Sequence, residues 1–70
     1  MKENGVVLKE FDIVKSIKRI SDTIDKDVIG SISMVMTDPL FLYLVIFYDG
    51  DEVIDYVLVD PEDIVLVRSV

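Results

Sequence analysis

The stretch FLYLVIFYDGDEVIDYVLV at residues 41–59 contains two apolar runs that flank the acidic turn YDGDE. Successive residues of an extended chain point to opposite faces, and Asp-Gly readily takes the positive φ that a tight hairpin turn needs. The stretch therefore predicts a β-hairpin with strands at residues 41–48 and 53–59. Except at Asp55, both strands are apolar on both faces, which is more surface than one small core can cover.

The segment before this hairpin predicts another strand. Residues 28–37 place small or polar residues mainly at alternate positions, as in a half-buried strand. Gly30 within it indicates a bend or a close approach of two backbones. Thr37-Asp38-Pro39 ends the strand, because proline cannot donate a hydrogen bond to the ladder.

The segment after the hairpin predicts a short break and a last strand. Asp60-Pro61-Glu62-Asp63 is typical of one helical turn, with Asp60 as its cap and Pro61 at its first position. The apolar residues 64–67 then predict the last strand of the chain.

The N-terminal third fits two structures. The β-branched residues within 11–17 and the polar cluster at 21–27 favour a strand followed by a long loop. Apolar positions in this segment also have helical spacing, which predicts a helix as the alternative. These positions are Ile13, Val14, Ile17, Ile20 and Ile24. Residues 1–10 are expected to fray or to add an edge strand.

Together, the segments predict a single domain over residues 1–70, because a chain of 70 residues has room for only one core. The predicted fold class is all-β, a small five-stranded SH3-like barrel over residues 11–67. It has a long first loop and a helical turn before its last strand. If residues 11–24 are helical instead, the fold is α+β, with one N-terminal helix packed on a four-stranded antiparallel sheet.

The same segments resemble an uncharacterised family of small bacterial SH3-like barrel proteins. The matching elements are Asp12-Ile13-Val14, Val28-Ile29-Gly30-Ser31-Ile32, residues 41–59 and Pro61-Glu62-Asp63-Ile64. In the last element, Ile64 comes one position earlier than the family pattern has it. The resemblance implies a fold and no particular activity.

The composition excludes several chemistries. The chain has no Cys and no His, which removes disulfides, zinc sites and catalysis by a thiol or an imidazole. Hydrophobic residues make up 51% of the chain, so apolar burial is expected to hold the fold together. No apolar run approaches the ~18 residues of a membrane-spanning helix, and the N-terminus lacks a signal-peptide core. We therefore predict a cytoplasmic location and no membrane partner.

The charges are unevenly distributed, with a net charge of −7. Six of the seven basic residues lie in the first 26 positions, and no Lys or Arg occurs from Asp27 to Val67. The acids in that stretch are Asp27, Asp38, Asp49, Asp51, Glu52, Asp55, Asp60, Glu62 and Asp63. Their field repels phosphates and attracts cationic surfaces. The basic residues near the first loop make a poor phosphate footprint, so no nucleic-acid partner is expected.

Two acidic clusters are candidates for catalysis or metal binding. They are Asp49, Asp51 and Glu52 in the hairpin turn and Asp60, Glu62 and Asp63 in the helical turn. General acid catalysis needs a carboxyl group in an apolar cleft, whereas turns are usually hydrated. The hairpin turn also lacks the spaced oxygen ligands of a calcium loop. We interpret both clusters as solvated turns and predict no catalytic residues, no metal, no cofactor and no enzyme activity.

The apolar surface that one core cannot hide is the strongest indication of function, and it must be covered by residues 1–10 and the long first loop, by another subunit or by a partner. Beside an acidic rim, it predicts a protein-binding module whose partner has a basic surface. The predicted partner-binding residues are Asp49, Asp51, Glu52, Asp55, Tyr43, Tyr48 and Tyr56. In general character the chain is similar to bacterial immunity proteins, so a basic, nuclease-type toxin domain is the partner we expect. The alternative is a homodimeric structural or accessory subunit that uses the same face for self-assembly.

Overall fold

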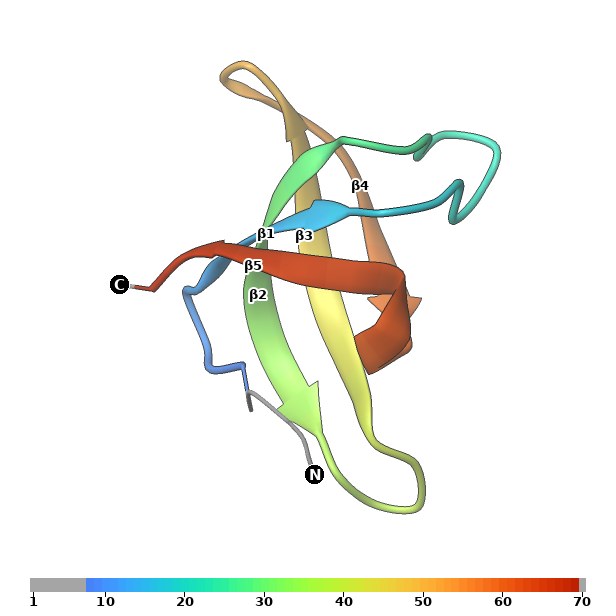
Figure 1. The fold of residues 1–70 in the computed structure, drawn as a ribbon, viewed down its shortest axis with the longest axis vertical. Helices are drawn as coiled ribbons and strands as arrows, with labels where there is room; N and C mark the ends of the chain where they lie inside the picture. Colours follow the sequence, from blue (N-terminus) through green and yellow to red (C-terminus); the bar gives the residue numbers. More distant parts are fainter. Residues whose placement is uncertain (1–7, 70) are drawn as a thin grey trace.

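The computed structural model describes residues 8–69 and contains a single sheet of five antiparallel strands (Figure 1). The elements are β1 (Ile13–Ser16), β2 (Ile29–Met36), β3 (Leu42–Asp49), β4 (Glu52–Val59), the 3₁₀ turn η1 (Pro61–Asp63) and β5 (Ile64–Arg68). The strand order across the sheet is β4-β3-β2-β1-β5. The predicted five-stranded all-β architecture, with a long first loop and a helical turn before the last strand, is confirmed.

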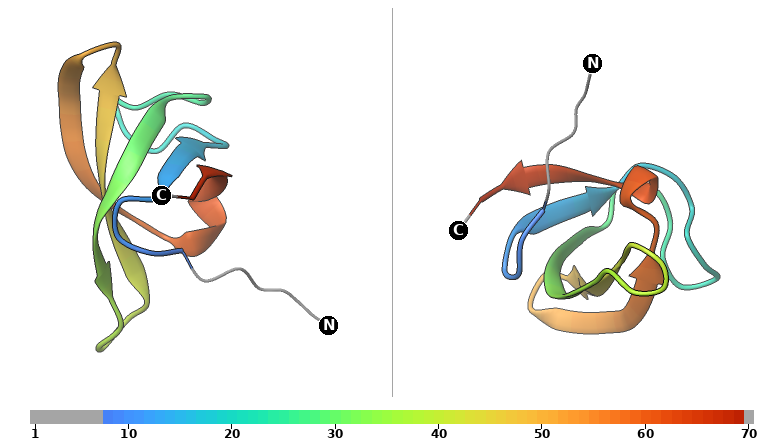
Figure 2. Two further views of the ribbon diagram at one scale, coloured as in Figure 1. Left: turned by 90° about the vertical axis from the view of Figure 1, so that its left-hand side faces the viewer. Right: turned by 90° about the horizontal axis from the view of Figure 1, so that it is seen from below.

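The sheet curves back on itself without closing. Figure 2 shows β2, β3 and β4 as one curved layer, with β1, β5 and η1 packed against it. The two ends of the strand order, β4 and β5, share no ladder, so the fold is barrel-like and open at one seam. We call the face of β2, β3 and β4 that is turned toward β1, β5 and η1 the inner face.

The core lies on the inner face. Strand β3 alternates strictly, and its buried side chains are Tyr43, Val45 and Phe47. Buried residues from the other elements complete the core, and these are Leu8, Val14, Ile24, Ile32, Val59 and Ile64. The alternation arises because successive side chains of a strand point to opposite faces, and only one face of β3 is turned toward the core.

The hairpin forms as its sequence predicts. Asp49 pairs with Glu52, so the turn itself consists of Gly50 and Asp51. Gly50 takes a left-handed backbone conformation with φ of 62°. The type II′ turn, one of the two preferred two-residue hairpin turns, has glycine at this first central position.

The N-terminal segment is a strand and a loop, so the helical alternative is wrong. Only Ile13–Ser16 form β1, and the chain then runs through a loop to residue 28. Ile24 lies in this loop and is fully buried in the core. Its apolar character, which also fits helical spacing, is therefore explained without a helix. The fraying or edge strand predicted for residues 1–10 falls mostly on residues 1–7, outside the described part, and residues 8–10 form no strand.

A buried serine holds the loop onto the sheet. The Ser16 hydroxyl donates to the carbonyl oxygen of Asp25 at 2.6 Å and accepts the backbone N–H of Val28 at 2.9 Å. The backbone of Ser16 adds two more bonds, to Asp27 and Val28. These bonds satisfy loop backbone groups that would otherwise be costly to bury, and they set the loop's end at the start of β2.

Within residues 8–69 no helix has the length and apolar character that crossing a bilayer requires.

Candidate functional site

The side of β2, β3 and β4 that is turned away from the core is almost entirely apolar. Leu44 lies between Met34 and Leu58 across the three strands, and Ile46 is opposite Tyr56. We call this surface the outer face. Ser31, opposite Ile46, is a polar member, and the apolar members include Met34, Met36, Leu42, Leu44, Ile46, Tyr48, Ile54, Tyr56 and Leu58. It corresponds to the second apolar face that the hairpin sequence predicted.

The outer face is open to solvent along β4 and β2. Tyr56 is 62% exposed, Met34 50% and Leu58 49%. An aromatic ring and two long aliphatic side chains exposed together form the kind of patch that marks interaction sites on small proteins.

The described N-terminal residues and the first loop pack on the inner side and leave the outer face open. The backbone N–H of Leu8 donates to the Tyr43 hydroxyl, and Tyr43 belongs to the inner face. The Thr23 hydroxyl in the loop donates to the Asp55 carboxylate at 2.9 Å. Burial of Ile24 then brings the loop further into the core.

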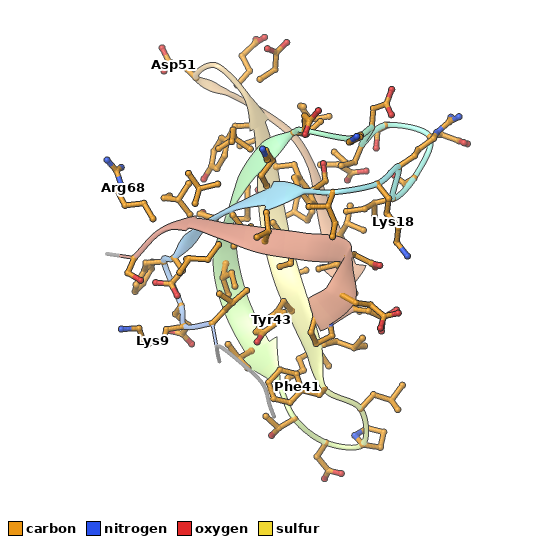
Figure 3. The ribbon with its side chains drawn as sticks, in the orientation of Figure 1. Lys9, Lys18, Phe41, Tyr43, Asp51 and Arg68 are labelled. Carbon is orange, nitrogen blue, oxygen red and sulfur yellow. The ribbon has the colours of Figure 1, made fainter. Side chains whose placement is uncertain are left out.

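Acidic residues bound the outer face at its two ends. Asp49, Asp51 and Glu52 are exposed at the hairpin tip, where Figure 3 shows Asp51 at the extreme end of the molecule. Asp38 lies at the opposite end, in the loop between β2 and β3. The side chains between these ends are uncharged, so a partner meets an apolar centre with negative ends.

Tyr43 does not belong to the exposed face that the sequence predicted for it. Its side chain is 1% exposed, and its ring packs edge-to-face on Phe41 with centroids 5.3 Å apart. Tyr43 therefore has a core role, and a partner cannot contact it in this conformation. The hairpin sequence could not show this, because residues on both faces of the strand are equally apolar.

Asp55 also lies on the wrong face for the predicted rim. It pairs with Phe47 across the β3–β4 ladder and so shares the inner side, where its carboxylate accepts the Thr23 hydroxyl. An inward-pointing charge on an edge strand is one way in which proteins discourage edge-to-edge pairing. Asp55 therefore fastens the loop to β4, away from the surface that carries Tyr56.

Of the remaining predicted residues, the structure brings Tyr48 and Tyr56 to the outer face and Asp49, Asp51 and Glu52 to its end. The outer-face residues that the predicted partner-binding set lacks are Met34, Met36, Leu42, Leu44, Ile46, Ile54 and Leu58. Alternation places Ile54 on one face with Tyr56 and Leu58, but it does not reveal the register shift between Phe47 and Tyr48, after which Tyr48 pairs with Val53. Met34 could have been found, since it lies in a strand predicted to pair with the hairpin.

The acids of the helical turn serve the fold. Asp63 is nearly buried and accepts the backbone N–H of Asp60 at 3.1 Å, which completes the first turn of η1. Its other oxygen lies 2.8 Å from the Lys18 ammonium. The hydrogen bond to Asp63 is the largest cause that raises the pKa of Lys18 above its ordinary value of 10.5. The charge of Asp63 and, to a smaller extent, that of Glu62 add to this effect.

Lys18→Met is expected to lower the free energy of unfolding at neutral pH. Because the folded-state pKa of Lys18 is raised, its pairing stabilises the fold fully below pH 10.5 and is lost as the pH rises through the folded pKa. Urea unfolding of both proteins across an alkaline pH series measures the difference, which should shrink at the highest pH. Lys26→Met, at an exposed position, is the control and should show little difference at any pH. A difference for Lys18→Met that stays constant throughout contradicts the assignment.

The two buried carboxylates, Asp12 and Asp63, lie at opposite ends of the β1–β5 ladder. Asp12 accepts the backbone N–H of Lys9 at 2.9 Å, so it orders the entry into β1. The part of the chain that the structure describes holds no group of three acids placed to bind a metal ion.

No protein-family model matches the chain, and no curated protein or solved structure gives a significant match. The resemblance to small bacterial SH3-like barrel proteins therefore stays a prediction.

Proposed function

We propose that the protein is a small binding module that docks its outer face on a basic surface of another protein. The observation that carries the proposal is the exposed apolar outer face, which ends at the acidic hairpin tip. Protein interfaces combine an apolar, aromatic-rich centre with a polar rim, and complementary charge speeds the encounter. A nuclease-type toxin domain has a basic cleft of this chemistry, so an immunity role is the specific form of the proposal.

A homodimer through the same face is the competing function. The net charge of −7 opposes the approach of two copies, because like charges repel when brought together. Sedimentation velocity of the pure protein tests this directly. We expect a monomer at micromolar concentration in both low and high salt, whereas a stable dimer that is insensitive to salt would assign the outer face to self-assembly and contradict the proposal.

The double variant Tyr56→Ala/Leu58→Ser is expected to abolish partner binding without loss of stability. Truncating a hot-spot residue at the centre of an interface costs about 2 kcal/mol or more, so the two changes together should weaken binding by roughly 10³-fold. Both side chains are exposed, so the free energy of unfolding should change by about 0.5 kcal/mol or less. Affinity capture from cells identifies the partner, and titration of the purified partner then measures its affinity for each variant.

Leu40→Ser is the matched control for this experiment. Leu40 is 64% exposed, close to the 62% of Tyr56, but it lies in the loop between β2 and β3. The Leu40→Ser variant should capture the same basic protein with wild-type affinity. If the outer-face variant binds the partner as tightly as Leu40→Ser does, the outer face is not the docking surface.

A further inference from the structure

A groove of about 540 Å³ lies where the outer face meets the hairpin tip. The groove is lined by Ile29, Tyr48 and Ile54, each from a different strand, and also by Asp27 and Asp49. The volume is within the range typical of small-ligand pockets. The groove therefore combines apolar walls, one aromatic ring and two negative charges.

The two carboxylates come from segments far apart in the sequence, and each is held by local structure. Asp27 has a left-handed backbone with φ of 68°, and its N–H donates to the carbonyl oxygen of Ser16 at 2.8 Å. Asp49 pairs with Glu52 at the closed end of the hairpin. The backbone at both residues is thus fixed before any ligand arrives, which lowers the entropy lost on binding.

The charge of the groove is only partly balanced. Lys15 is the basic residue paired with Asp27, at 3.7 Å, and both side chains are substantially exposed. A long, exposed ion pair of this kind contributes little to stability, so its loss on binding another cation costs little. Asp49 has no ion-pair partner among residues 8–69. Asp51 and Glu52 on the adjoining tip add to the negative field.

We propose that this groove receives an arginine side chain of the docked partner. The inference rests on the proposed function, because the groove continues the outer face. The apolar walls fit the methylene stem of arginine, and the ring of Tyr48 offers a face for its guanidinium. The carboxylates supply charge-assisted hydrogen bonds to the same group. Arginine is preferred over lysine because a planar guanidinium can stack on the ring and pair with a carboxylate at once.

The test is an NMR titration of isotope-labelled protein with N-acetyl-arginine methylamide. A probe of this size should bind with roughly millimolar affinity. The amide shifts should be concentrated at residues 27–29, 48–50 and 54. The neutral isostere N-acetyl-citrulline methylamide should bind about tenfold more weakly, because it keeps the shape and loses the charge. Equal binding of the two probes, or shifts spread over the whole acidic surface, would overturn the inference.

Two double variants distinguish binding at the groove from attraction by the general negative field. One is Asp27→Asn/Asp49→Asn, and the other is Asp51→Asn/Glu52→Gln. Both pairs remove two negative charges, but only the first pair lines the groove. The first should weaken the arginine probe about tenfold and the second by less than about twofold. Asn tolerates the left-handed backbone of residue 27, so the fold is retained. Equal weakening by both pairs would reduce the groove to one part of a diffuse negative field and contradict the proposal.

The failure of this inference is distinguishable from failure of the proposed function. If Tyr56→Ala/Leu58→Ser loses the partner but the arginine probe does not bind wild type, the outer face docks without an arginine anchor. If the probe binds but the outer-face variant keeps the partner, the groove is an arginine site and the outer face is not the docking surface.

Discussion

Val45→Asp is expected to unfold the protein at neutral pH. Val45 is fully buried on the inner face and pairs with Val57 near the middle of the β3–β4 ladder. A carboxylate at this position would lose its hydration and find no cation in the core, at an effective cost of several kcal/mol. A domain of this length has a total stability of only about 4 to 10 kcal/mol, so the change removes most or all of it.

Circular dichroism with thermal melting, and the dispersion of amide signals in NMR spectra, measure this loss. Val53→Asp is the matched control, since it places the same charge in the same hairpin at a residue that is 47% exposed. It should fold and melt within a few degrees of the wild type, because an exposed charge stays hydrated. A folded Val45→Asp protein with unchanged melting would show that the inner face of β3 is not the core.

Gly30→Ala is expected to destabilise the protein by about 3 kcal/mol, at the upper end of the overpacking range. An added Cβ would lie 2.7 Å from Cγ1 of Val45, 2.8 Å from the carbonyl oxygen of Ile46 and 3.0 Å from a ring carbon of Phe47. The carbonyl oxygen belongs to the paired strand and cannot swing aside as a flexible side chain can. Without such crowding, Gly→Ala usually stabilises a protein by reducing the entropy of the unfolded chain.

The second described glycine provides the control for this prediction. At Gly50 an added Cβ meets open space, but φ is 62°, so Gly50→Ala should cost about 1 kcal/mol through backbone strain alone. Gly50→Asn should recover most of that loss, because Asn tolerates the left-handed region. Gly30→Asn should be worse than Gly30→Ala, because the clash grows with side-chain size. Urea unfolding of the four variants measures these differences, and rescue by Asn at residue 30 would contradict a steric cause.

Local sequence features predicted most of the secondary structure. The Gly50-Asp51 turn, the Pro61 turn and the stop at Pro39 act within a few residues, so their effects can be inferred without the rest of the chain. The close approach at Gly30 was likewise predicted and is confirmed by the contacts that a Cβ would make there. At residues 11–24 the pattern permitted two structures, because Ile24 is buried by a loop as fully as a helix would bury it.

The candidate site was predicted less completely than the fold. The sequence indicated a second apolar face, and Tyr48 and Tyr56 do lie on it. Tyr43 and Asp55 were placed with them, but the structure puts both on the inner side. The groove could not be predicted at all, since Asp27 and Asp49 line it together only because the Ser16 bonds fix the end of the loop beside the hairpin.

The sequence by itself determined where the strands and turns fall and that one hairpin has more apolar surface than a lone core can cover. Only the tertiary structure decided which side of that hairpin is buried. Alternation with a period of two residues distinguishes the two faces of a strand. It shows which face is buried only when the other face is polar, and residues 41–48 are apolar on both faces. The choice was made by contacts distant in sequence, from Leu8 to Tyr43 and from Thr23 to Asp55, which close the inner side and leave the other to solvent.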